Sequence, residues 1–339
     1  MGQVSTIGLD LAKNVFQVHG IDAEGKVIVR RSLRRAEVLS FFTKLSPCLV
    51  GMEACGTAHH WARELMKIGH IVKLMPSAYV KAYVKRGKTD AADAEAIAEA
   101  VTRPTMRFVA VKTVYQQGVL MEHKVRELLV RQRTMLINAL RGHLAEFGIV
   151  AALGSVGVKS AIEQFHAEQT CLPEMARSAL RRLIDQIGEV DYEIRKSEKA
   201  IVAWCRSDTA SRRLMTIPGI GPITASLISA TVPDPTLFGS GRQFAAWLGL
   251  TPKPRSSGGK ERLGGISKQG DGLIRRLLVI GATSVIRRAR EDSLSRAWAT
   301  KLLESKPARV VSVALANKTA RIAWAVLARG EVYKAAAAA

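Results

Sequence analysis

The chain has 339 residues, 47% of them hydrophobic, and its 51 Lys and Arg residues outnumber its 29 Asp and Glu residues to give a formal net charge of +22. This length predicts two or three domains, no apolar run is long enough to cross a bilayer, and no secretory signal or CxxC pair indicates a secreted disulfide framework or a zinc ribbon. Such a charge favours a polyanion as partner, and because the basic residues are spread over the whole chain, a nucleic acid fits better than an anionic membrane.

The first part of the chain reads as a sheet with helices. Three segments have the β-branched content and the DAEGK turn of a strand meander: 4–10, 14–21 and 26–33. Helices and strands then alternate, with a helix at 34–45, a strand at 48–53, a helix at 57–69, a strand at 70–76 and a helix at 76–86. The order β-β-β-α-β-α-β-α predicts an α/β domain of the ribonuclease-H-like class.

A run of long helices follows. The alanine-rich segment from Asp90 is a strong helix former with Thr89 or Asp90 as its N-cap, and Pro104 closes it. Residues 113–147 and 173–207 read as two long amphipathic helices, and we expect the Gly-bearing segment AALGSVGVKS to be a break between them. This pattern predicts an antiparallel helical stalk, an arrangement that commonly makes a dimer contact.

The character of the chain changes near Asp208. The segment IPGIGPITA is followed by Gly-, Pro- and Ser-rich loops around 251–272 and by arginine-rich helices to about residue 329. We therefore divide the chain into an α/β domain at 1–112, a helical stalk at 113–207 and a mainly α-helical C-terminal domain at 208–339.

Four acidic residues are candidates for a metal site. Asp10 ends the first strand, Glu53 ends the strand at 48–53, and the i, i+3 spacing of Asp90 and Asp93 puts both on one helical face. In a ribonuclease-H-like sheet the first and fourth strands are neighbours and the last helix packs across them, so the four carboxylates would converge. Four negatively charged carboxylates can lie this close together around divalent cations. Two Mg²⁺ ions held this way activate a nucleophile against a phosphodiester. The alternatives are that Asp10 is a turn residue, that Asp90 is a helix cap and that Asp93 lies on a solvated helix face. An actin-like ATPase is disfavoured because no second Gly-rich loop is present.

The C-terminal part carries two candidate DNA contacts. In IPGIGPITA, Gly219 and Gly221 have the pattern of a helix-hairpin-helix, whose backbone N–H groups approach a DNA phosphate; a plain interhelical turn is the alternative. The stretch 242–278 is the densest in glycine, serine and cation. Its candidate nucleophiles are Ser256, Ser257 and Ser267, and its candidate phosphate contacts are Arg255, Lys260, Arg262, Lys268, Arg275 and Arg276. From these residues alone, a basic loop without chemistry fits this stretch better than a catalytic one.

Taken in order, several motifs resemble the DEDD-type transposases of the IS110 family of insertion sequences, over nearly the whole chain. They are GLDLAKNVFQVHG, GMEACGTAHHWARELMKIGH, KTDAADAEAIAEA, IPGIGPITA, FAAWLGLTPKPRSSGGKERLGGISKQGDGLIRRLL and ARIAWAVL. Cys55 and Ala58 depart from the more usual form of the second motif and indicate a divergent subgroup.

The resemblance implies a RuvC-like N-terminal domain, a helical stalk and a C-terminal transposase domain. Asp10, Glu53, Asp90 and Asp93 would hold two Mg²⁺ ions, and Ser257, which matches the family pattern better than Ser256, would be the nucleophile that joins DNA. The resemblance also implies donor and target DNA as substrates, a non-coding bridge RNA as guide, a homodimer or homotetramer, and a bacterial cytoplasmic, nucleoid-associated setting.

Three functions compete. The first is a Mg²⁺-dependent serine recombinase that exchanges and religates strands, and the second is a RuvC-like endonuclease that uses water and keeps the serine loop structural. The third is a DNA- or RNA-binding architectural protein without catalysis.

Overall fold

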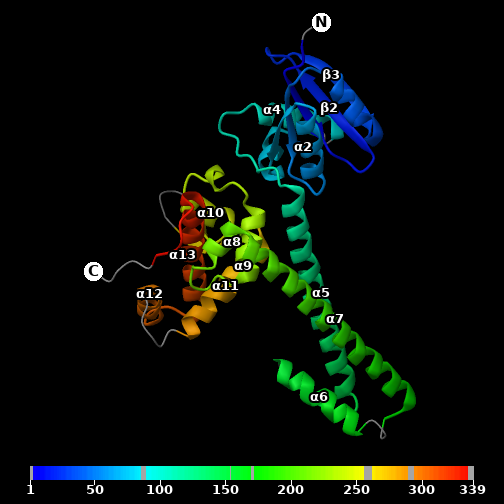
Figure 1. Cartoon of the computed structure of the whole chain (residues 1–339), viewed down its shortest axis with the longest axis vertical. Coiled ribbons are helices and arrows are strands. Elements are labelled where there is room, and N and C mark those ends of the chain that lie inside the picture. The colour runs from blue at the N-terminus through cyan, green and yellow to red at the C-terminus, as the bar shows by residue number, and fades with distance from the viewer. Residues whose placement is uncertain are drawn as a thin grey trace. The chain divides into compact units, whose positions relative to one another are not determined.

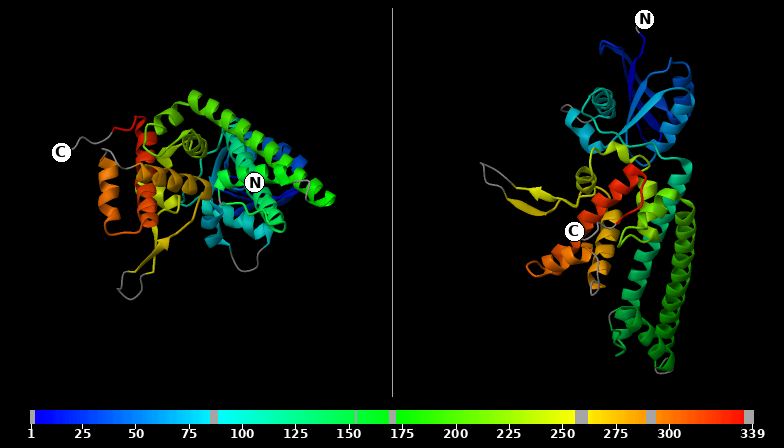
Figure 2. Two further views of the ribbon diagram at one scale, coloured as in Figure 1. Left: turned by 90° about the horizontal axis from the view of Figure 1, so that it is seen from below. Right: turned by 60° about the vertical axis from the view of Figure 1, so that its left-hand side comes forward.

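The computed structural model describes residues 3–84, 89–152, 154–168, 172–255, 262–288 and 294–334. Its contacts group the chain into two compact units (Figures 1 and 2). Unit 1 consists of Met1–Gln116 and Val232–Ser240, and unit 2 of Gln117–Thr231 and Gly241–Ala339. Most of the helical segment expected as a stalk therefore belongs to the same unit as the C-terminal region.

Unit 1 is built on a mixed five-stranded sheet with the order β3-β2-β1-β4-β5. The first three strands form the expected antiparallel meander, while β4 runs parallel to β1 and to β5. The predicted contact between the first and fourth strands is therefore confirmed. The strands are β1 Thr6–Asp10, β2 Val15–Ile21, β3 Val27–Arg34, β4 Leu49–Glu53 and β5 Ile71–Met75.

The helices of unit 1 follow the sequence pattern with one shortening. The expected helix at 76–86 ends early, because the backbone turns extended at Val84 after one helical turn and one 3-10 turn. The helices are α1 Val38–Thr43, α2 Ala58–Lys67, α3 Ser77–Val80 and α4 Asp90–Val101, with 3-10 turns at Arg35–Glu37, Lys81–Tyr83 and Pro235–Leu237.

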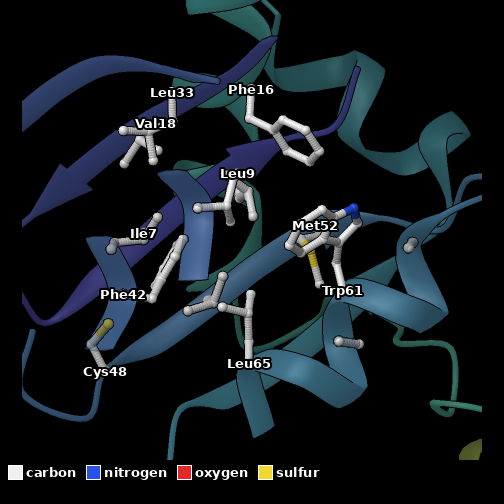
Figure 3. Close-up of a cluster of buried hydrophobic side chains, with 14 of the residues drawn as sticks. Ile7, Leu9, Phe16, Val18, Leu33, Phe42, Cys48, Met52, Trp61 and Leu65 are labelled. Carbon is white, nitrogen blue, oxygen red and sulfur yellow. The ribbon is translucent and has the colours of Figure 1, made fainter. Parts of the chain in front are cut away.

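The main core of unit 1 lies on the side of the sheet that α1 and α2 cover (Figure 3). Alternate residues of the strands, including Ile7, Leu9 and Phe16, point into it, and the Phe16 ring meets the Trp61 ring edge-on at 5.0 Å. Burial of each such side chain contributes about 1.5–3 kcal/mol. The alternation leaves the other residues of β1 on the opposite face, which α4 covers.

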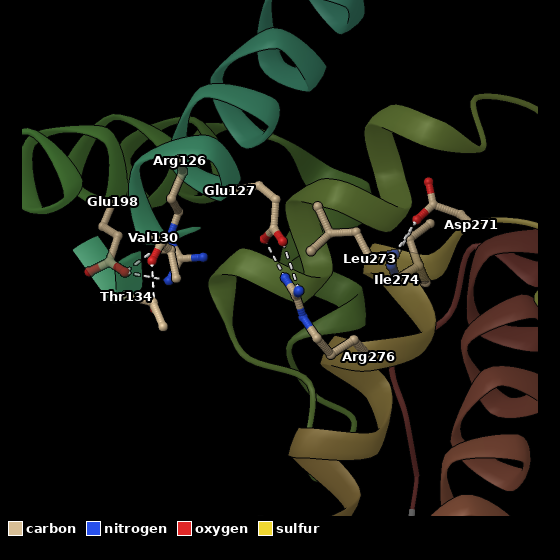
Figure 4. Close-up of polar contacts among 9 residues, drawn as sticks. All are labelled: Arg126, Glu127, Val130, Thr134, Glu198, Asp271, Leu273, Ile274 and Arg276. Carbon is tan, nitrogen blue, oxygen red and sulfur yellow. Dashed lines mark hydrogen bonds and ion pairs between the residues drawn. The ribbon is translucent and has the colours of Figure 1, made fainter. Parts of the chain in front are cut away.

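The two expected long helices are α5 (Val114–Ala145), which belongs to unit 2 from Gln117 onward, and α7 (Glu174–Ser207), which lies wholly in unit 2. They are antiparallel, because Arg126 pairs with Glu198 while the later Arg133 pairs with the earlier Asp191 (Figure 4 shows the first pair). A buried cluster continues this contact and is formed by Leu140, Leu144, Leu180 and Ile187.

The expected break at AALGSVGVKS is only partly correct, because α6 (Gly154–Glu168) starts within it. Ala161 and Phe165 lie four residues apart on α6 and are buried in the cluster between α5 and α7. The sequence pattern indicated a break because Gly154 and Gly157 have poor helix propensity. The burial of α6 offsets this poor propensity.

The C-terminal part of unit 2 is mainly helical, as expected, with one short hairpin that Figure 2 shows extending from the helices. Contrary to the expectation that no apolar run is long enough, its longest helix, α13, could cross a bilayer by length and composition, but it packs against α10 and α11 as a core helix. The elements are α8 Thr209–Leu214, α9 Pro222–Thr231, α10 Gly241–Trp247, β6 Pro252–Pro254, β7 Leu263–Ile266, α11 Gly272–Arg287, α12 Leu294–Leu303 and α13 Ala308–Arg329.

Candidate metal site and nucleic-acid interface

Asp10 stands at the end of β1 on the α4 side of the sheet. Leu9 points into the opposite core, so strand alternation places Gly8 and Asp10 together on this face. In the parallel pair, Leu9 lies beside Met52, and Glu53 therefore follows next to Asp10 at the same edge of the sheet. Two of the four predicted acids are thus placed by strand register alone.

The other two acids reach this edge because α4 lies directly on β1. A Cβ added to Gly8 would lie 2.1 Å from the carbonyl oxygen of Ala94 and 2.4 Å from the backbone nitrogen of Ala98, so only a glycine allows this approach. The helix starts beside the end of β1, where Thr89 is the N-cap and its Oγ1 accepts a hydrogen bond from the Ala92 N–H. No local sequence pattern indicates this role of Gly8.

Asp10, Asp90 and Asp93 form a carboxylate trio. One oxygen from each lies within 4.8 Å of the others. Burial of Asp10, together with the charges of Asp93, Asp90 and Glu53, raises the pKa of its carboxyl to about 6. Glu53 acts on Asp10 through its charge but is not part of the close trio.

The donor set of this trio fits a hard divalent cation. All of its ligand atoms are carboxylate oxygens, the type that Mg²⁺ and Ca²⁺ prefer. Besides burial, the charges of Asp93, Asp90 and Glu53 raise the pKa of Asp10, so these carboxylates repel one another. A divalent ion would remove this repulsion.

The predicted helix-hairpin-helix segment connects α8 to α9. Gly219 has the left-handed φ of +86°, and its carbonyl oxygen would be 2.0 Å from a Cβ on Gly281 of α11. A surface groove of about 390 Å³ adjoins this turn, and its lining includes Gly221 and Arg288. The turn is thus a tight helical hairpin that opens on a groove with a cation at its side.

The candidate serine loop stands between β6 and β7 in the chain. Ser256, Ser257 and Lys260 are outside the described residues. Arg255 and Arg262 are exposed at the described end of the hairpin, where the Arg255 N–H donates to the Arg262 carbonyl at 2.7 Å.

The base of this hairpin contains two more candidates. Lys268 is exposed and has a positive φ of 57°. The Ser267 N–H donates to the Thr251 carbonyl at 2.8 Å, so the backbone of this serine belongs to the hairpin base.

Arg275 and Arg276, expected to contact phosphates, both bind groups inside unit 2. Arg276 forms a forked ion pair with Glu127 of α5 (Figure 4), and Arg275 Nη1 donates to the carbonyl oxygens of Leu248 at 2.9 Å and Gln269 at 2.8 Å. Both guanidinium groups therefore hold the start of α11 against its neighbours. Sequence reasoning missed this role because their partners are distant in the chain.

Two histidines, His59 and His123, make contacts inside the fold. His59 accepts a hydrogen bond from the Lys112 N–H, and burial with the charges of Lys112 and Arg63 lowers its pKa to about 4. His123 lies buried on α5 with Nε2 2.9 Å from Ser226 Oγ, and burial also lowers its pKa to about 4. The His123 contact ties α9 to α5 and had no signal in the sequence.

Comparison with known proteins gives matches over the whole chain. Residues 7–149 match the family model of the IS110 DEDD group described as "Transposase", and residues 211–298 match one described as "Transposase IS116/IS110/IS902 family". A "Probable family 20 transposase" of Pseudomonas aeruginosa is 50% identical over 98% of this chain and 99% of its own length.

Two further relatives are named for insertion sequences. The "Transposase for insertion sequence element IS1111A" of Coxiella burnetii is 40% identical over 99% of this chain and 93% of its own length. The "Transposase for insertion sequence element IS1328" of Yersinia enterocolitica is 39% identical over 98% and 99%.

Proposed function

The chain belongs to the IS116/IS110/IS902 family of transposases, and from this premise we propose that it is an RNA-guided, Mg²⁺-dependent DNA recombinase with a serine nucleophile. As an insertion-sequence transposase it is an enzyme that cuts and rejoins DNA. Guide RNA, metal identity and nucleophile are the proposed parts.

The observation that carries the proposal is the carboxylate trio at the junction of β1 and α4. The strand order and the parallel β1–β4 pair support a RuvC-like, ribonuclease-H-like fold for this unit. Asp10, Asp90 and Asp93 would hold Mg²⁺ with Glu53 nearby, and the ions would supply charge stabilisation to a phosphodiester at this edge.

The proposed chemistry conserves the number of phosphodiester bonds. The Ser257 hydroxyl loses its proton and attacks phosphorus, a serine–phosphate ester forms, and the sugar oxygen leaves and takes up a proton. Attack by the corresponding hydroxyl of the other DNA partner reverses these steps and frees the serine. No net hydrolysis occurs, which distinguishes the enzyme from a water-using endonuclease.

The remaining parts rest on family resemblance and charge. The net charge of +22 suits simultaneous binding of donor DNA, target DNA and a non-coding guide RNA. The groove beside Gly219 and Gly221 and the exposed Arg255 and Arg262 are proposed phosphate contacts. A homodimer or homotetramer, acting on nucleoid DNA in the cytoplasm, would pair the acids of one subunit with the serine of another.

The experiment is a trapping assay on DNA that carries the element's end, with Mg²⁺ and the flanking non-coding transcript. Wild-type protein should form a covalent DNA adduct, and Ser257→Ala should neither form the adduct nor cut. Cutting by Ser257→Ala without an adduct would instead indicate a water-using nuclease. Ser256→Ala is the matched control and should retain the adduct. Adduct formation by Ser257→Ala at the wild-type rate would refute the assigned nucleophile.

A further inference from the structure

The sheet face that carries Asp10 continues across β2 and β3 as a polar strip. The antiparallel register pairs Asp10 with Gln17, and Gln17 in turn with Ser32. Leu33, the neighbour of Ser32, is buried in the main core. Because side chains alternate along each strand, these residues therefore all point to the opposite face of the sheet. Two residues farther along β3, Arg34 shares this face and pairs with Val15.

Helix α4 covers only part of this face. It contacts β1, β2 and β4, and the Arg30 guanidinium of β3 pairs with its Glu95. Ser32 and Arg34 are exposed, Gln17 is half-buried, and Val15 is 43% exposed. The uncovered strip therefore starts at the carboxylate trio and runs to the outer edge of the sheet.

The side chains of the strip present hydrogen-bond donors and a positive charge. Ser32 Oγ donates to Gln17 Oε1 at 2.8 Å, and this bond orients the amide so that the two N–H donors of Gln17 remain for another partner. Among the described residues the Arg34 guanidinium has no ion pair, in contrast to Arg30. Such a set of neutral and charged donors suits phosphate oxygens.

We propose that the strip of Gln17, Ser32 and Arg34 binds the phosphate backbone of the DNA strand that leads into the carboxylate trio. The proposal rests on the proposed function, since DNA must reach the trio to be cut. Two strand spacings separate Asp10 from Ser32, or about 10 Å, which is the rise of about three nucleotides along one strand. The strip thus holds phosphates a few positions from the reacting one and acts by positioning.

The test measures DNA affinity against salt concentration in EDTA, where no cleavage occurs, with a duplex of the element's end and flank. Arg34→Gln is compared with Arg31→Gln, a matched control that removes the same charge from the same strand. Arg31 is also exposed but pairs with Val18 and therefore faces the other side of the sheet. Arg34→Gln should lower the slope of log Kd against log salt by about one, so its affinity falls about threefold less than that of wild type between about 50 and 200 mM salt.

A second measurement locates the contacted phosphate by changing the DNA, so it does not depend on any change in the fold of the protein. Duplexes with one uncharged methylphosphonate at each position near the cut are bound to wild type and to Arg34→Gln. At the contacted position wild type should lose affinity and the variant should not. The double variant of Gln17→Leu with Ser32→Ala should weaken binding severalfold with an unchanged salt slope, because it removes donors but no charge.

Equal salt slopes for Arg34→Gln and Arg31→Gln would overturn the proposal. A loss of affinity by Arg34→Gln that appears with RNA transcripts but not with DNA would overturn it as well. Failure of the proposed function is separate, since it would appear as undiminished cleavage by Asp10→Asn. If Asp10→Asn abolishes cleavage while Arg34→Gln binds and cuts as wild type does, the function stands and the strip has no role.

Discussion

Replacement of Gly8 by alanine tests how the sheet and α4 bring the acids together. The new Cβ would lie 2.1 Å from the Ala94 carbonyl oxygen, whereas an ordinary contact is at least 3.4 Å, so β1 and α4 must separate by about 1 Å. The obstacle is backbone, which no rotamer change can relieve. Overpacking of this kind costs about 1–3 kcal/mol, and a misplacement of about 1 Å in a catalytic site costs about 100-fold in rate.

We therefore expect Gly8→Ala to unfold at a lower temperature and to cleave DNA about 100-fold more slowly. Gly56→Ala is the matched control, because a Cβ there meets nothing within 4 Å and the backbone needs no positive φ. Melting curves and single-turnover cleavage measure both effects. Wild-type cleavage by a folded Gly8→Ala protein would refute the view that this close approach builds the site.

Three other changes have definite expected results. Since the pKa of Asp10 is raised to about 6, the free energy of unfolding of the metal-free protein should fall by about 1–2 kcal/mol, after a discount for solvent screening, as pH rises from about 4 to 6. Denaturant titration should show that Asp10→Asn or added Mg²⁺ removes this loss. The pKa of His123 is lowered to about 4, so its stabilisation is complete above about pH 6.5 and is lost as pH falls toward 4; His123→Gln should lack this acid dependence in the same titration, and an unchanged acid limb would contradict it. Arg275→Met deprives two carbonyl oxygens of their donor and should destabilise the hairpin base by about 1–3 kcal/mol, seen as faster proteolysis near residue 250, with partial rescue by Arg275→Lys.

The elements of unit 1 were predictable because their signals are local. Alternating apolar residues marked the strands, and Gly69, with a φ of +96°, ended α2 where expected. The i, i+3 spacing of Asp90 and Asp93 placed both on the face of α4 that meets Asp10, as the trio shows.

Other features depend on contacts that no local pattern encodes. Gly8 looks like any strand glycine until α4 is placed on it, and Phe165 of α6 is buried in a cluster with residues of α5 and α7. The phosphate contact expected of Arg276 stays a prediction, and no local pattern indicated its ion pair with Glu127, which is 149 residues away. Such pairings follow from the three-dimensional arrangement, which spacing along the chain does not give.

The most direct test of the account is Mn²⁺ binding to the full chain, measured by electron paramagnetic resonance of the free ion. The account predicts saturable binding by wild type that Asp93→Asn weakens at least about tenfold, because one of three converging carboxylates is lost. The control Asp22→Asn alters an acid that accepts hydrogen bonds from the Glu24 and Lys26 N–H groups in its own turn, and should bind as wild type does. Equal Mn²⁺ affinity in wild type and Asp93→Asn would contradict the metal site.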